Sequence, residues 1–191
     1  MRILSKLILK LFGWKVIGTM PEDVKKCIMI EAPHTSNYDF VLGRLAFYQL
    51  GIDVKFLIKK ELFKFPLGGL LRAMGGIAVD RGKKNNMVDY VADIFNKTDK
   101  LVVVITPEGT RKYNSHWKKG FYHIAAKANV PILLGFIDYK KKEGGIGPRI
   151  IPSGDYEADF RIIEEFYKDK TACNPEMFNL SPMYRDKNKT V

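Results

Sequence analysis

A histidine and an aspartate five positions apart, His34 and Asp39, are the residues whose types and spacing best suit acid–base chemistry. A carboxylate can accept a proton from one imidazole nitrogen, which fixes the tautomer and leaves the other nitrogen basic. The spacing also suits a helix start with Ser36 as N-cap and Asp39 at the third position, which would hold the carboxylate rigidly. The sequence has no Gly-x-Ser-x-Gly nucleophile elbow. The pair therefore indicates a base that activates a hydroxyl supplied by a substrate.

A second group of polar residues, at positions 107–111, directly follows an apolar run. Residues 106–109 have the composition of a type I turn, but such a turn leaves Arg111 unexplained. A guanidinium group binds phosphate with two parallel hydrogen bonds, so Arg111 is a candidate for binding an anionic part of a substrate. Arg81 is a second candidate, although a surface salt bridge would explain it equally well.

Apolar runs that are typical of strands alternate along the chain with stretches of helical periodicity. The expected strands are residues 27–30, 54–58, 77–79, 101–105 and 132–137. The expected helices are residues 39–50, 61–74, 86–96, 118–128 and 156–169, and residues 140–152 are typical of a hairpin or loop at the sheet edge. The pattern predicts a single-domain α/β fold with a mixed, largely parallel sheet flanked by helices. Because chemistry gathers beyond the carboxyl ends of parallel strands, the polar groups that follow these strands are expected to converge.

The net charge indicates an anionic partner. The 191 residues include 32 Lys and Arg and 21 Asp and Glu, which gives a net charge of +11. Residues 155–191 hold six basic and eight acidic residues, or −2, so residues 1–154 carry 26 minus 13, or +13. Nucleic acid, a membrane surface and a phosphorylated substrate all fit this excess. Nucleic-acid binding is not expected, because the densest basic runs are short and most aromatic residues fall in apolar runs.

Residues 1–18 predict an amphipathic helix that docks on a membrane. Basic side chains at a spacing of four share one helical face: Arg2, Lys6 and Lys10. Apolar side chains at helical spacing share the other face: Leu4, Leu7, Ile8 and Leu11. Such a helix can lie in the headgroup layer of an anionic bilayer, and packing of its apolar face on its own domain is the alternative. A signal peptide is not expected, because Lys10 interrupts the apolar region and no small-x-small cleavage site follows.

Other classes of protein are excluded by composition. No uninterrupted apolar run reaches the roughly 18 residues that are needed to span a bilayer. The two cysteines, Cys27 and Cys173, are too few for a disulfide scaffold and lack the spacing of a zinc or redox pair. A reducing, cytosolic environment is therefore expected.

These residue clusters resemble the motifs of the lysophospholipid (1-acylglycerol-3-phosphate) acyltransferases. The resemblance rests on motifs in the family's order, at positions 34–39 (His-x4-Asp), 60–62 (Lys-Glu-Leu), 76–81 (Gly…Asp-Arg), 107–111 (Pro-Glu-Gly-Thr-Arg) and 130–132 (Val-Pro-Ile). The matching order and spacing extend over residues 27–137, somewhat more than half of the chain. A match of several motifs in one order is highly specific to a family, but it leaves the identity of the acceptor open.

The resemblance implies a role for each matching residue. His34 would be the general base on the acceptor hydroxyl, and Asp39 would orient it and stabilise the imidazolium. Arg81 would bind the phosphate or other anionic head of the acceptor, with Lys60 as a further substrate-binding residue. The acceptor-binding loop would consist of Glu108, Gly109, Thr110 and Arg111. The acyl donor would be an acyl thioester on acyl carrier protein or coenzyme A as a co-substrate, with no metal and no bound cofactor.

We therefore expect three segments: a membrane-association helix at 1–18, an acyltransferase domain at 19–170 and a loosely packed tail at 171–191. The leading hypothesis is an acyltransferase that esterifies a lyso-lipid hydroxyl in membrane-lipid synthesis. It would act as a peripheral membrane protein at the cytoplasmic face. Its expected partners are membrane lipids, the lyso-lipid acceptor and acyl carrier protein, but no nucleic acid. Two alternatives stay open: O-acylation of an amino-acid lyso-lipid, and a lipid-binding protein that keeps the fold without catalysis.

Overall fold

A computed structural model describes residues 1–80 and 84–180, apart from the side chains of residues 84–86. The strands of this part of the chain are β1 (Lys15–Ile17), β2 (Lys26–Ala32), β3 (Val54–Lys59), β4 (Gly76–Val79), β5 (Leu101–Ile105), β6 (Ile132–Asp138) and β7 (Glu143–Ile150). The α-helices are α1 (Arg2–Leu11), α2 (Asn37–Leu50), α3 (Leu67–Ala73), α4 (Lys84–Asn96), α5 (Gly120–Ala128) and α6 (Tyr156–Tyr167). Two short 3₁₀ helices are η1 (Lys60–Phe63) and η2 (Pro175–Met177).

The strands form one sheet in the order β1-β7-β6-β2-β5-β3-β4. All neighbouring pairs are parallel except β6 and β7, which are antiparallel. The predicted α/β fold with a mixed, largely parallel sheet is thus confirmed. The stretch expected as a hairpin or loop at 140–152 contains strand β7, which follows a short turn and pairs antiparallel with β6.

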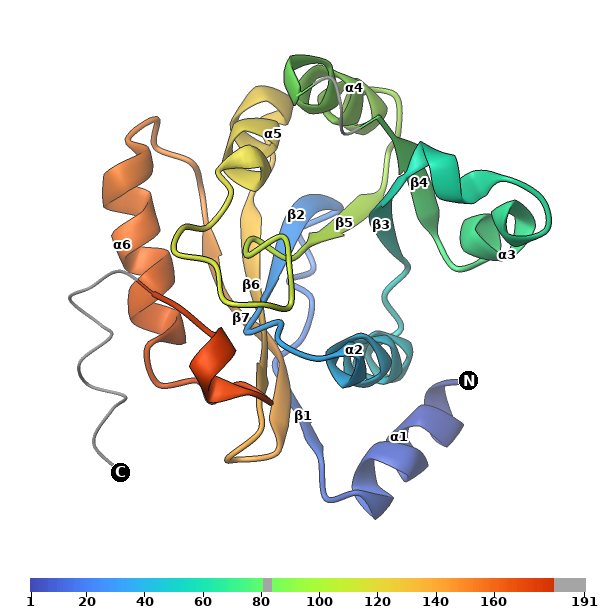
Figure 1. Cartoon of the computed structure of the whole chain (residues 1–191), viewed down its shortest axis with the longest axis vertical. Coiled ribbons are helices and arrows are strands. Elements are labelled where there is room, and N and C mark those ends of the chain that lie inside the picture. The colour runs from blue at the N-terminus through green and yellow to red at the C-terminus, as the bar shows by residue number, and fades with distance from the viewer. Residues whose placement is uncertain (81–83, 181–191) are drawn as a thin grey trace.

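The central strands are buried on both faces because helices cover both (Figure 1). Ile28 and Ile30 of β2 face a core built with α4, α5 and α6. Cys27 and Met29 alternate with them and face a second core that includes Phe47 of α2. This two-sided burial explains why the central strands have continuous apolar sequences.

The stretch expected as one helix over 61–74 is interrupted. The structure has η1, then an extended Lys64, and α3 begins only at Leu67. Pro66 explains the break, because proline lacks an N–H and disfavours helical geometry in the residue before it.

The amino-terminal helix forms as expected but ends at Leu11, and residues 15–17 of the expected helical segment form strand β1 instead. Ser5 and Leu9 are its buried residues, and α1 packs on α2. The apolar side chains expected on one face point largely to solvent, with Leu4 53%, Leu7 59% and Leu11 82% exposed. Among the described residues, no helix combines the length and apolar character that a membrane span needs.

The expectation of a loosely packed tail is wrong for residues 171–180. Ala172, Asn179 and Leu180 are buried, and the indole N–H of Trp117 donates to the carbonyl of Asn179 at 2.9 Å. Polar pairing of backbone groups, which composition does not reveal, holds this segment to the domain. Residues 181–191 of the expected tail lie outside the described part of the chain.

Candidate active site

The predicted pair of His34 and Asp39 lies together at the carboxyl end of β2. The Nδ1 atom of His34 is 3.2 Å from Oδ2 of Asp39. An ionised carboxylate only accepts hydrogen bonds, so this contact places the proton on Nδ1 and leaves Nε2 as the basic nitrogen. The His34 side chain is 17% exposed and that of Asp39 is 2% exposed. The dyad therefore has a buried acid and a base that reaches the surface.

The start of α2 holds the carboxylate in place. Ser36 is the N-cap, and its hydroxyl accepts from the N–H of Tyr38 at 3.2 Å. Oδ2 of Asp39 accepts the backbone N–H groups of Thr35 and Ser36, each at 2.8 Å. This is the predicted capping box, which favours a negative charge at the helix start.

Hydrogen bonds keep Asp39 ionised. Burial alone would raise the pKa of Asp39. The hydrogen bonds from His34, Tyr139 and the Ser36 N–H outweigh that effect and hold the pKa below its ordinary value. A carboxylate at neutral pH can stabilise the imidazolium that forms when His34 takes a proton.

The loop at 107–111 lies against the dyad, but its residues point in different directions. Glu108 is buried, and its Oε1 accepts the backbone N–H of His34 at 2.8 Å. Glu108 thus fixes the backbone at His34 by a hydrogen bond, whereas Gly109, Thr110 and Arg111 are exposed. The turn closes through the Gly109 N–H on the Thr106 carbonyl at 3.1 Å. It favours glycine because φ at position 109 is +67°.

The other predicted substrate-binding residues lie at the same edge of the sheet. Lys60 directly follows β3, and its ammonium pairs with Asp80 just after β4. Strands are about 4.8 Å apart, so two strand spacings, roughly 10 Å, separate β3 from β2. Arg81 lies outside the described residues. Of the strand ends expected to converge, the 107–111 loop contacts the dyad through Glu108, whereas Lys60 and Asp80 pair with each other at the same edge of the sheet.

Two residues of the site have no sequence signal that distinguishes them. The hydroxyl of Tyr139, which follows β6, donates to Oδ1 of Asp39 at 2.6 Å, across 100 positions of sequence. Asn174 holds Thr35 from the other side, since its N–H donates to the Thr35 hydroxyl and its side-chain amide to the Thr35 carbonyl. Only tertiary structure brings these residues to the dyad.

Tyr139 is expected to support the dyad without touching substrate. Tyr139→Phe removes the hydrogen bond to Oδ1 and keeps the ring that packs edge-on against Trp14 at 5.1 Å. Loss of one hydrogen bond to a charged group is worth about 1.5 kcal/mol, so we expect kcat to fall about tenfold with KM unchanged. Steady-state kinetics with an acyl thioester and a lyso-lipid, the substrates that the sequence motifs predict, measure both constants.

A matched control is Tyr48→Phe, which removes a hydroxyl that Arg44 binds elsewhere on α2. This variant should keep both constants. An unchanged kcat in Tyr139→Phe, or a rise in KM alone, would show that the hydroxyl does not position the dyad.

Two carboxyl groups with raised pKa values, Glu31 and Glu108, lie close enough to the dyad for the charge of Asp39 to act on them. Burial raises the pKa of Glu31 to about 8, and the charge of Asp39 adds to the effect. Burial likewise raises the pKa of Glu108 to about 8. The Glu31 carboxyl lies against α2, where a Cβ at Gly43 would come within 2.6 Å of Oε1. Glycine therefore allows the helix to approach this group.

Stability is expected to fall as the pH rises from about 5 to 8. The unfolded chain releases the Glu31 proton near its ordinary pKa of 4.5, whereas the folded chain keeps it to about 8. Within this window the folded state binds more protons, so rising pH favours unfolding. Glu31→Gln removes the contribution, and its Tm should fall less between these pH values than that of the wild type. Equal falls in thermal melts would mean that Glu31 is already ionised in the folded state.

No group of three or more metal-ligating side chains occurs in the described part of the chain. The dyad itself supports acid–base chemistry. A base with a free Nε2 can take a proton from a hydroxyl. The exposed residues 109–111 and Lys60 offer polar and cationic groups at the same edge.

The sequence is similar to those of known acyltransferases. Residues 16–133 match the protein family described as Acyltransferase. A 1-acyl-sn-glycerol-3-phosphate acyltransferase of Saccharomyces cerevisiae is 34% identical over 128 residues, which are 62% of this chain and 41% of that protein. The 1-acyl-sn-glycerol-3-phosphate acyltransferase beta of Homo sapiens is 25% identical over 119 residues, 59% of this chain and 41% of that protein. The chain spans about two fifths of the length of these relatives.

Among solved structures, the fold is similar to that of the 1-acyl-sn-glycerophosphate (LPA) acyltransferase PlsC from Thermotoga maritima. The TM-score is 0.58 at 20% sequence identity, and the match covers 86% of this chain and 74% of that chain. At this identity the likeness concerns the fold.

The fold and the site define an α/β protein that carries a His–Asp dyad at the carboxyl edge of a largely parallel sheet. The family match covers 118 of 191 residues (133 − 16 + 1) and includes both the dyad and the 107–111 loop. The chain belongs to the Acyltransferase family, as its sequence motifs predict.

Proposed function

We propose that this chain transfers a fatty acyl group from an acyl thioester to a free hydroxyl of a lyso-lipid such as 1-acylglycerol-3-phosphate. The observation that carries the proposal is the dyad, in which Nδ1 of His34 is held by a buried carboxylate. Family membership and the names of the relatives support the same reaction. Acyl carrier protein and coenzyme A both fit as carriers of the acyl group.

In the proposed reaction, Nε2 of His34 takes the proton of the acceptor hydroxyl while its oxygen attacks the thioester carbonyl. The ester C–O bond forms and the C–S bond breaks, and the leaving thiolate takes up the proton from Nε2 of His34, which restores the neutral imidazole. Asp39 stabilises the imidazolium in between. The substrate oxygen is the nucleophile, so no acyl-enzyme is needed. Burial raises the pKa of Cys27 to about 12, so its thiol does not compete as a nucleophile.

The anionic head of the acceptor is proposed to bind at the exposed end of the 107–111 loop. Arg111 is exposed there. A Cβ at Gly109 would come within 2.5 Å of the Lys118 ammonium nitrogen, so this second cation lies beside the loop. Two cations at one loop suit a phosphate group. Lys118 adds a candidate that its sequence context does not distinguish.

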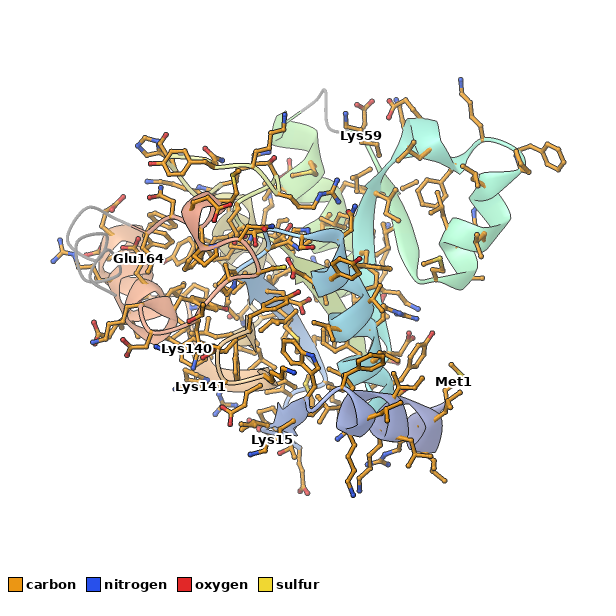
Figure 2. All side chains as sticks on the ribbon, turned by 60° about the horizontal axis from the view of Figure 1, so that its bottom comes forward. Met1, Lys15, Lys59, Lys140, Lys141 and Glu164 are labelled. Carbon is orange, nitrogen blue, oxygen red and sulfur yellow. The ribbon has the colours of Figure 1, made fainter. Side chains whose placement is uncertain are left out.

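We also propose that α1 docks on the cytoplasmic face of a membrane. In the described part of the chain, its apolar side chains Leu4, Leu7 and Leu11 are more than half exposed, and Phe12 at its end is 63% exposed. Exposed lysines gather where the chain leaves the helix, because the Lys15 N–H bonds the Lys142 carbonyl at 2.9 Å. Figure 2 shows Lys15, Lys140 and Lys141 at that end of the molecule. An apolar helix face beside cations suits an anionic lipid surface.

The proposed function is tested by incubating purified protein with an acyl donor and a panel of lyso-lipids that includes an amino-acid lyso-lipid. The donor is either acyl-coenzyme A or acyl carrier protein loaded with a fatty acyl group. Mass spectrometry should detect the diacylated product of 1-acylglycerol-3-phosphate. Lipid binding without transfer to any member of the panel would favour the non-catalytic alternative.

A further inference from the structure

The segment between β3 and β4 stands out from the rest of the molecule. Residues 59–73, here called the η1–α3 lobe, pack mainly on themselves and on the two strands that carry them. Figure 1 shows η1 and α3 at the edge of the fold, beside β3 and β4. Within the lobe only Gly68 is buried, where a Cβ would come within 2.2 Å of the Phe63 carbonyl oxygen.

The apolar side chains of the lobe point outward. Those that are more than half exposed are Leu62 (52%), Phe65 (98%), Leu67 (53%) and Leu70 (59%). Phe63 is the contrasting aromatic residue, because it packs inward against Gly76 and under the guanidinium of Arg72. Four largely exposed apolar side chains within nine consecutive residues at the edge of the fold are typical of a docking surface.

The charge of the lobe favours an anionic lipid surface as the occupant. It holds four basic residues and one acidic residue, Glu61, for a net charge of +3. Lys59 is exposed where the lobe leaves β3, as Figure 2 shows, and Lys64 is exposed beside Phe65. Apolar side chains interleaved with cations are typical of segments that lie in the bilayer interface. A second copy of the chain would present the same positive charge, which opposes self-association.

The lobe lies at the edge of the sheet that carries the dyad. It begins at the carboxyl end of β3, and β2, β5, β3 and β4 are parallel neighbours. Phe40, which directly follows Asp39 on α2, packs on Phe56 of β3, the strand that leads into the lobe, with ring centroids 5.5 Å apart. Tyr38 and Val41, one and two positions from Asp39, are 71% and 54% exposed. A membrane held by the lobe would therefore lie at the edge of the sheet that carries His34.

We propose that the η1–α3 lobe inserts its apolar tip, with Phe65 foremost, into the interface of an anionic bilayer. It is a second contact besides α1, and it turns the carboxyl edge of the sheet toward the membrane. The inference rests on the proposed function, because a lyso-lipid acceptor resides in that interface.

The direct test places a fluorescent reporter at the tip. Phe65→Trp introduces an indole at the most exposed position of the lobe. Vesicles of phosphatidylcholine and phosphatidylglycerol with brominated acyl chains should quench its emission beyond the quenching of the wild type, whose indoles are Trp14 and Trp117. Bound protein without extra quenching would overturn the proposal, because the tip would then lie outside the bilayer while α1 holds the protein there.

A matched pair of variants tests binding and turnover. Leu67→Ser/Leu70→Ser alters the lobe, and Ile151→Ser/Ile162→Ser alters two residues of similar exposure elsewhere, 63% and 55%. The lobe variant should bind the vesicles about tenfold more weakly than the control. Its turnover of a short-chain, monomeric 1-acylglycerol-3-phosphate should equal that of the control, whereas turnover of acceptor embedded in vesicles should fall.

The outcomes separate the two proposals. Vesicle binding that is equal in both variants would contradict docking by the lobe, whatever the activity. An inactive wild type on both forms of the acceptor would contradict the proposed function, while quenching and vesicle binding would still report on the lobe.

Discussion

His34→Ala is expected to lower the rate of acyl transfer by roughly 10²- to 10⁴-fold, the usual contribution of a general base. Because Nδ1 of His34 is bound to Asp39, Nε2 is the nitrogen that would take the proton in the proposed reaction. The loop should keep its shape without the imidazole, because Glu108 accepts the backbone N–H of residue 34 rather than its side chain. Initial rates with an acyl thioester and 1-acylglycerol-3-phosphate give the comparison.

The control for this variant is His123→Ala, which removes an exposed imidazole on α5. It should leave the rate unchanged. If His34→Ala retains wild-type turnover and an unchanged Tm, the base must be another group.

Asp39→Asn is expected to have the second-largest effect, a loss of about 10²-fold or more in kcat. The amide keeps the shape of the carboxyl group but removes the charge that stabilises the imidazolium. Its NH₂ group must also face one of four donors: the His34 imidazole, the two N–H groups of Thr35 and Ser36, and the Tyr139 hydroxyl. Activity and thermal melts should be measured on the same preparation.

The stability change separates two explanations of such a loss. Alteration of a capping box costs about 0.5–2 kcal/mol, which would leave the domain folded at 25 °C. We therefore expect a moderate fall in Tm with a far larger fall in kcat. A variant that unfolds with no intrinsic loss of kcat in its folded fraction would make Asp39 a structural residue only.

The fold follows from local patterns where those patterns are strong. The apolar runs of β2, β5 and β6 are long enough to mark buried strands, and helical stretches between them predict parallel pairing. The short strand β1 is not predictable in this way, because its three residues depend on backbone pairing with β7. Pro66 is a sequence signal for the break before α3, but the apolar periodicity of 61–74 favours one continuous helix.

The His34–Asp39 dyad is predictable from the sequence because it is local. His34, Ser36 and Asp39 lie within six consecutive positions, and a single helix start fixes their geometry. The supporting residues Tyr139 and Asn174 come from distant parts of the chain. Their residue types are common on protein surfaces, so only the packing of 139 and 171–180 against the dyad identifies them. The inward turn of Glu108 is likewise a result of tertiary burial.

The central claim is direct transfer from thioester to hydroxyl, with His34 as base and no acyl-enzyme. The measurement is the intact mass of the wild-type protein after mixing with an isotope-labelled acyl thioester, first without acceptor and then with it. Direct transfer predicts an unchanged protein mass at both stages. The labelled acyl group should pass to the lipid once the acceptor is added. A protein-bound acyl group that forms without acceptor and disappears when acceptor arrives would contradict it.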